Sequence, residues 1–157
     1  MSSLESILSD ERILCRAACS SKKRALELLA ELIAGDSRER TAGVQDQSVS
    51  ELFELLIARE RLGSTGIGNG IAIPHCRCAG LDRAVGAVIT LENGIDFDAV
   101  DGAPVDIIFA MVVPQDGGSE HLQRLAVLAE ALQTPGFVAS LRSAETPAQL
   151  FAAARAA

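Results

Sequence analysis

The chain has only two histidines, and His75 stands where an imidazole can react. It closes a glycine-rich segment and directly follows Pro74, which fixes the backbone before the ring. The small residues of the segment leave space around the ring, so we expect an exposed imidazole that is held in place. Packing alone does not explain such a loop, because ordering glycine costs conformational entropy. The pattern favours a nucleophilic histidine.

His121 and Arg59 are the other candidates for this site. His121 comes two residues after Ser119, a predicted helix cap, and shares a helix side with three leucines, so it should point inward or along a cleft. Taken alone, such a histidine is more often structural. Arg59 is predicted at the edge of a buried helical stripe, with its guanidinium reaching outward; the alternative is a plain surface arginine. Glu60, closer to the centre of that stripe, indicates that the helix frays here.

The loop before His75 supplies further donors for an anion. Two hydroxyls and the amides of a glycine-rich loop, which can form an anion-binding nest, complete a phosphate-sized pocket. The glycine spacing does not fit a dinucleotide-binding loop, because position 71 is Ile, and no Lys-Ser or Lys-Thr follows as in a nucleotide-binding P-loop. The candidate phosphate contacts are Ser64, Thr65, Gly66 and Asn69.

The cysteines raise an alternative chemistry. The run His75-Cys76-Arg77-Cys78, with Cys15 and Cys19 as further ligands, would suit a zinc or thiol-redox protein. However, structural zinc sites usually use cysteines separated by two to four residues, and buried apolar thiols explain Cys15 and Cys19 equally well. We therefore expect free thiols, no metal and no cofactor.

Composition restricts the remaining function classes. A length of 157 residues suits one domain with one core, predicted to span residues 1–157. The net charge of -7 disfavours nucleic acid as a partner. No apolar run approaches the ~20 residues of a membrane-spanning helix, and the first residues do not resemble a secretion signal. We expect a cytoplasmic protein without membrane insertion.

Hydrophobic spacing predicts the elements that position these residues. Helices are expected over 21–33, 49–61 and 119–133, the second begun by a capping box of Ser48 and Glu51, and two shorter helices should start at the Thr-Pro pairs 134–135 and 146–147. Strands are expected over 71–73, 84–91 and 105–113, with a loop over 36–47. Turn signals at Asn93-Gly94 and Asp101-Gly102 predict a separate edge strand over 95–97. The order predicts an α/β or α+β sandwich in which helices cover a central sheet.

One long segment resembles a known family. The run from Arg59 to His75, Arg-Glu-Arg-Leu-Gly-Ser-Thr-Gly-Ile-Gly-Asn-Gly-Ile-Ala-Ile-Pro-His, is similar to the IIA proteins of the bacterial phosphotransferase system, especially their nitrogen-regulatory branch. The resemblance covers roughly residues 13–155. Further similar segments are Ser21-Lys-Lys-Arg-Ala-Leu-Glu-Leu, Arg83-Ala-Val-Gly, Phe97-Asp-Ala-Val-Asp, Pro104-Val-Asp-Ile-Ile-Phe-Ala and Glu120-His121-Leu.

The resemblance implies a function and a site. It implies that His75 is phosphorylated on Nε2 by an HPr-like phosphocarrier, that Arg59 and His121 line the pocket, and that a mixed sheet lies between helices on both sides. Without sugar-specific domains, the chain would be a regulatory phosphotransferase component of nitrogen or potassium type, with target proteins of kinase or transporter type. The alternatives are a sugar-specific fructose or mannitol IIA component and a binding module that has lost phosphorylation. Whether the chain forms a homodimer stays open.

Cys76 departs from the family pattern. Relatives usually carry glycine directly after the histidine. If that position required a positive φ, cysteine would cost ~1 kcal/mol or more. Cys78 is also unexpected.

Overall fold

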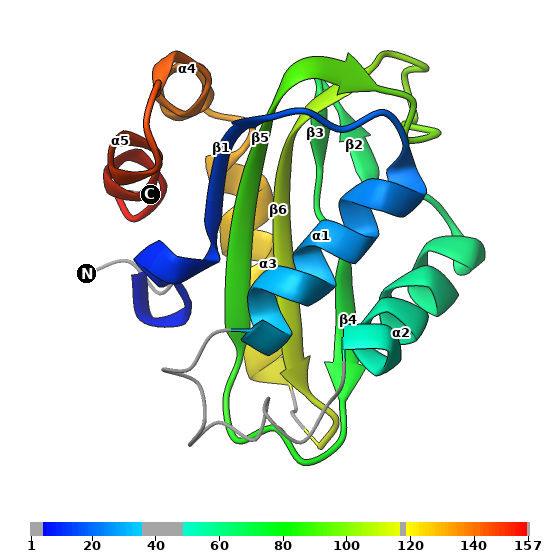
Figure 1. Cartoon of the computed structure of the whole chain (residues 1–157). Coiled ribbons are helices and arrows are strands. Elements are labelled where there is room, and N and C mark those ends of the chain that lie inside the picture. The colour runs from blue at the N-terminus through cyan, green and yellow to red at the C-terminus, as the bar shows by residue number, and fades with distance from the viewer. Residues whose placement is uncertain (1–4, 36–48, 117–118, 157) are drawn as a thin grey trace.

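The computed structural model describes residues 5–35, 49–116 and 119–156, and at 35 and 119–121 it describes the backbone alone. The predicted loop over 36–47 and the Ser48 cap lie outside these residues. Along the chain the elements are η1 (Glu5–Ile7), η2 (Asp10–Arg12), β1 (Ile13–Ala17), α1 (Lys22–Gly35), α2 (Val49–Leu62), β2 (Gly66–Gly68), β3 (Ile71–Ala72), β4 (His75–Cys78), β5 (Val85–Ile95), β6 (Val105–Pro114), α3 (Ser119–Ala131), α4 (Pro135–Ser143) and α5 (Pro147–Ala154) (Figure 1).

The strands form one mixed sheet in the order β1-β5-β6-β3-β2, and β4 also pairs with β6. The long central strands β5 and β6 are antiparallel, whereas β1 runs parallel to β5, and both β3 and β4 run parallel to β6. β3 and β4 lie one after the other along the same edge of β6, at Ile107 and Ile108 and then from Met111 onward.

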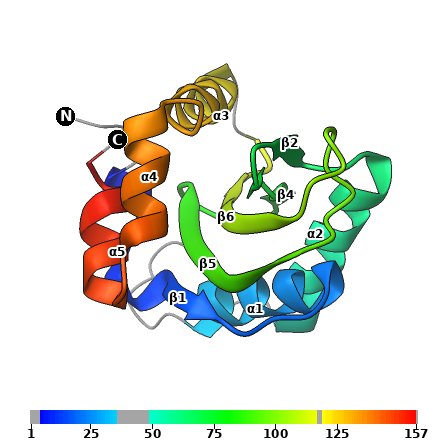
Figure 2. The same cartoon turned by 90° about the horizontal axis from the view of Figure 1, so that it is seen from above.

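Helices cover both faces of the sheet, as predicted. α1 and α2 pack on one face, and α3, α4 and α5 lie on the other (Figure 2). β6 shows why both faces are apolar: its even-numbered residues from Ile108 to Val112 join the α1 and α2 core, and its odd-numbered residues from Ile107 to Val113 join the other. This alternation is expected for a strand that is buried on both sides. None of the helices in the described part of the chain combines the length and apolar character needed to cross a bilayer.

The predicted helices agree with the structure to within two residues at their described ends. At the start of α1 the Ser21 hydroxyl accepts a hydrogen bond from the Arg24 amide at 3.1 Å, which confirms the predicted cap. The strand over 105–113 is also confirmed. Three short strands, β1, β2 and β4, were not predicted, because runs of three to five residues carry too little periodicity.

The predicted turn at Asn93-Gly94 and the separate strand over 95–97 are wrong. β5 continues through both residues to Ile95, which pairs with Val105 beyond a register shift. Gly94 serves a close approach here, since a Cβ at that position would lie 2.8 Å from the Cβ of Pro104. A glycine can mark either a turn or a close approach of another segment, and here it allows the close approach of Pro104.

The two Thr-Pro helix starts give a stability prediction. The Thr146 hydroxyl accepts a hydrogen bond from the Gln149 amide at 3.2 Å, whereas the Thr134 hydroxyl makes no cap bond and donates to the Glu130 carbonyl at 3.3 Å. We expect Thr146→Ala to lower the free energy of unfolding by about 1 kcal/mol and Thr134→Ala by clearly less. Urea titration of both variants measures the difference, and equal losses would contradict it.

Candidate functional site

His75 is the first residue of β4, so a strand rather than a loop holds it. Its Nδ1 lies 2.9 Å from the carbonyl oxygen of Ile73, and the Met111 amide of β6 donates to the Pro74 carbonyl at 3.0 Å. A carbonyl can only accept, so Nδ1 carries a proton, and in the neutral ring the lone pair is then on Nε2. The imidazole is partly exposed, and this contact orients it.

A cleft of about 370 Å³ lies beside this ring, between α2, β4 and α3. The structure brings Arg59 and His75 together in it, although sixteen positions separate them in the sequence. Most of the lining is apolar. The described lining residues are Leu55, Ala58, Arg59, Leu62, His75, Cys76, Arg77, Val113, Leu122 and Leu125.

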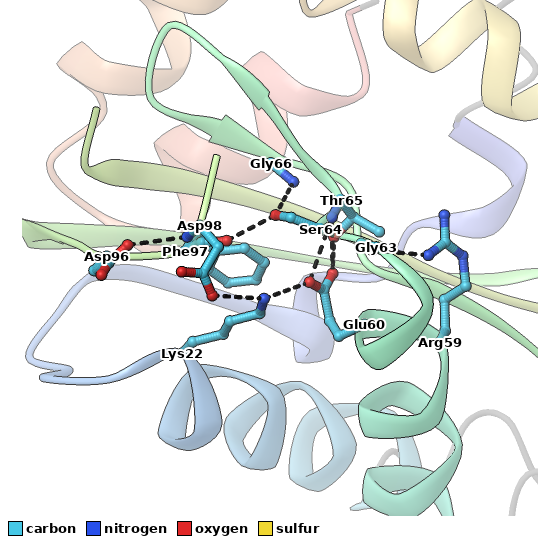
Figure 3. A network of polar contacts seen from close by, with 10 residues as sticks. All are labelled: Lys22, Arg59, Glu60, Gly63, Ser64, Thr65, Gly66, Asp96, Phe97 and Asp98. Carbon is cyan, nitrogen blue, oxygen red and sulfur yellow. Dashed lines mark hydrogen bonds and ion pairs between the residues drawn. The ribbon is translucent and has the colours of Figure 1, made fainter. Parts of the chain in front are cut away.

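Arg59 is fixed at the end of α2. Its Nη1 donates to the carbonyl oxygen of Gly63 at 2.9 Å, just past the last turn of the helix (Figure 3). Cations near a helix C-terminus are favoured by the helix dipole, and this bond also gives a partner to the carbonyl directly after the helix. The guanidinium is thus held at the edge of the cleft.

Glu60 does not fray the helix, as the sequence suggested, but anchors the loop that follows it. α2 continues to Leu62, and the buried Glu60 carboxylate accepts hydrogen bonds from both the amide and the hydroxyl of Thr65. Lys22 at the start of α1 lies 2.7 Å from the same carboxylate, and its ammonium sits 5.0 Å from the centre of the Phe97 ring. Figure 3 shows these groups converging between α1, α2 and the loop. These partners compensate the burial of the carboxylate, so Glu60 does not disrupt the end of α2.

The four loop residues predicted to contact phosphate bond elsewhere. Thr65 is held by Glu60, and the Ser64 hydroxyl donates to the Phe97 carbonyl at 2.7 Å while accepting from the Gly66 amide at 3.0 Å. The Asn69 amide donates to a carboxylate oxygen of Asp101 at 3.0 Å. None of the four is among the described residues that line the cleft. In this geometry they shape the loop, and the partners of Ser64 and Asn69 lie too far along the sequence for the motif to reveal them.

His121 lies in the first turn of α3, but its side chain is outside those that the structure describes. Leu122 and Leu125 of the same helix line the cleft, so α3 borders the site. A contact between His121 and the phosphoryl group stays a prediction.

Sequence reasoning missed Arg77 as a cleft residue. It stands two positions after His75, and alternate residues of a strand project to the same face. That signal becomes visible only when residues 75–78 are recognised as a strand, and their sequence, His-Cys-Arg-Cys, does not suggest one.

Cys76 fits its position without strain. It lies in the extended β4 strand and is not among the non-glycine residues with positive φ, which are Arg16, Asn69 and Asp98. Burial, followed by the proximity of Cys78, raises the pKa of the Cys76 thiol to about 12. The doubt about cysteine in place of glycine is therefore resolved, because this chain forms a strand here.

The zinc or thiol-redox alternative finds little support in this geometry. β5 and β6 separate β1, which carries Cys15, from β4, and Cys15 packs against the other core from Cys76 and Cys78. Among the described side chains, no three or more His, Cys, Asp or Glu residues are grouped as metal ligands.

Cys76 should react slowly with alkylating reagents. With a pKa of about 12, its thiolate fraction at pH 8 is on the order of 10⁻⁴. We expect iodoacetamide at pH 8 to modify the partly exposed Cys19 well before Cys76, as followed by peptide mass spectrometry. Equal rates at the two sites would contradict the burial of the Cys76 thiol.

Known proteins share both the sequence and the fold. Residues 6–155 match the family described as phosphoenolpyruvate-dependent sugar phosphotransferase system, EIIA 2. A nitrogen regulatory protein of Pseudomonas aeruginosa is 45% identical over 148 residues, which cover 94% of this chain and 92% of that protein. The crystal structure of nitrogen regulatory protein IIA-Ntr from Neisseria meningitidis matches with a TM-score of 0.86 and 37% identity, covering 98% of this chain and 99% of that one. The crystal structure of IIA mannitol from Escherichia coli shares the fold, with a TM-score of 0.71 and 16% identity over 94% of this chain and 98% of that one.

These matches confirm the resemblance seen in the segment from Arg59 to His75. The family match spans nearly the whole chain, and the relatives of higher identity are nitrogen regulatory proteins. The chain belongs to the EIIA 2 family of the phosphoenolpyruvate-dependent sugar phosphotransferase system.

Proposed function

We propose that His75 accepts a phosphoryl group on Nε2 from an HPr-like phosphocarrier protein, and that the chain acts as a regulatory phosphoryl carrier. The observation that carries the proposal is the bond between His75 Nδ1 and the Ile73 carbonyl, in a cleft that Arg59 also lines. It supplies an oriented nucleophile with a cation nearby, which is what phosphoryl transfer requires.

The transfer step uses the neutral form of the His75 ring, with its proton on Nδ1. The Nε2 lone pair attacks the phosphorus of the donor phosphohistidine in line with the breaking bond, so one N–P bond forms as the other breaks. The electron pair of the broken bond returns to the donor imidazole. Both states are phosphoramidates, so the step needs no nucleotide or metal to drive it. The Ile73 carbonyl accepts the hydrogen bond from Nδ1 and so holds the ring proton on that nitrogen. It also stabilises the positive charge that the ring gains.

The cleft is suited to a protein donor. Leu62 and Leu122 line it while remaining 84% and 62% exposed, so an apolar rim surrounds the reactive ring. Exposed apolar side chains gathered in one place favour contact with another protein. Covering this rim during transfer would also exclude water, which competes with His75 for the phosphoryl group.

The regulatory role rests on the relatives. The proteins that match nearly the whole chain at 45% and 37% identity are named nitrogen regulatory proteins, which favours a regulator over a sugar-specific fructose or mannitol component. We propose that the carrier works in the cytoplasm and binds target proteins of kinase or transporter type, in nitrogen or potassium regulation. A sugar-specific component would instead pass its label quickly to a IIB-type domain, so that transfer assay separates the two roles.

Labelling by a phosphorylated donor tests the carrier function. We expect the purified chain, mixed with a ³²P-labelled HPr-like phosphocarrier, to take up about one phosphoryl group, since the proposal has one acceptor. The label should be labile in acid and stable in base, as a phosphoramidate is. No uptake, or a label that survives acid as a serine or threonine ester does, would contradict the proposal.

A further inference from the structure

We propose that Arg77 is a second phosphoryl-binding residue, which contacts the phosphoryl group on His75 from the β4 side while Arg59 approaches from α2. This inference rests on the proposed function of His75. It goes further because it assigns a role to a residue that the motif around His75 does not suggest.

The strand geometry puts Arg77 within reach. β4 pairs with β6 in a regular parallel register, His75 opposite Met111 and Arg77 opposite Val113. With a rise of about 3.3 Å per residue, the two residues stand about 7 Å apart on one face of the strand. That distance is comparable to the length of an arginine side chain. The intervening Cys76 alternates with them and joins the α1 and α2 core, although it also borders the cleft.

Charge balance supports the same assignment. Phosphorylation adds about two negative charges to a cleft that is mostly apolar. Among the described residues that line the cleft, Arg59 and Arg77 carry the formal charges, and both are cations. A second arginine in this lining reduces the net negative charge that one arginine alone would leave in apolar surroundings.

One hydrogen bond of Arg77 goes to a neutral acceptor, which a phosphoryl oxygen can replace. Its Nη1 donates to the carbonyl oxygen of Gln115 at 3.2 Å, a neutral acceptor at an exposed position. A phosphoryl oxygen is a charged acceptor, and the planar guanidinium can bind two such oxygens at once. Arg77 also lines a second cleft, with Glu51 and Glu54, that continues along α2. It therefore lines both clefts, on the strand that also carries His75.

Phosphoryl acceptance by Arg77→Gln and Arg77→Lys tests the role. Arg155→Gln is the matched control, because it removes the same charge from an exposed position. Arg155 is the C-cap of α5, a helix that lies at the opposite edge of the sheet from β4 (Figure 1). Loss of a charge-assisted contact should slow acceptance by Arg77→Gln on the order of 10- to 100-fold, with lysine restoring part of the rate. The control should match the wild type.

A second readout separates contact with phosphate from a role in docking the donor. A cation beside the phosphoryl group favours its dianion, so removing Arg77 should raise the phosphoryl pKa in a ³¹P NMR titration of the phosphorylated protein. Wild-type acceptance by Arg77→Gln, or slow acceptance with an unchanged phosphoryl pKa, would overturn the proposed contact while leaving His75 as acceptor. Failure of the wild type itself to take up phosphate would overturn both proposals.

Discussion

Replacing His75 with alanine is expected to abolish phosphoryl acceptance and to leave the protein folded. Loss of a catalytic nucleophile usually lowers a rate by on the order of a thousandfold or more, because neighbouring groups cannot form the same covalent intermediate. The cost in stability should be small, about 1 kcal/mol, since the partly exposed ring loses one hydrogen bond to the Ile73 carbonyl. Uptake of label from a phosphorylated donor measures the first effect, and urea unfolding measures the second.

His121→Ala is the informative comparison for that variant. His121 is predicted to assist at the pocket rather than to receive the phosphoryl group, so its loss should slow acceptance without removing it. Label that persists in His75→Ala but disappears in His121→Ala would show that the roles of the two histidines are reversed.

Replacing Glu60 with alanine should produce the largest loss of stability of any variant considered. The carboxylate is buried and accepts from the Thr65 amide and hydroxyl, and its removal leaves that amide without a partner inside the protein. The Lys22 ammonium would stay only partly unpaired in this variant, because the side chain is 20% exposed and its Nζ lies 3.5 Å from a carboxylate oxygen of Asp98. We therefore expect a loss of about 3 kcal/mol, at the lower end of the range for a broken buried ion pair.

Glu54→Ala is the matched control for Glu60→Ala. It removes a glutamate from the same helix at an exposed position, where substitutions usually change stability by about 0.5 kcal/mol or less. Urea titrations of both variants measure the difference at equal m-values. The account of Glu60 as the anchor of the loop fails if the two variants unfold at the same urea concentration.

The sequence predicts the elements with strong periodicity and the residues of the site that a local motif places. Helices α1 and α2, strand β6 and the role of Ser21 as a cap follow from spacing and capping chemistry alone. The meeting of Arg59 and His75 in one cleft was also expected, because Arg59 comes just before the glycine-rich segment that ends at His75.

The rest depends on partners that are distant in the sequence. Ser64 bonds to the carbonyl of Phe97, and Asn69 bonds to Asp101, so groups expected to bind phosphate are used to hold the loop. From the sequence alone, Glu60 is a charged residue in an apolar helical stripe, and only the structure shows that Lys22 of another helix pairs with it. From the sequence alone, Gly94 predicts a turn, and only the structure shows that it makes room for Pro104. In each case, packing against another segment determined which of several locally allowed conformations or hydrogen bonds the residue adopts.

The nitrogen that carries the phosphoryl group tests the central claim most directly. NMR of the phosphorylated protein with ¹⁵N-labelled histidine detects the coupling between ³¹P and the ring nitrogen to which it is bound. The account predicts coupling to Nε2 of His75, with Nδ1 still protonated and bonded to the Ile73 carbonyl. Phosphorus on Nδ1 of His75, or on any other residue, would contradict it.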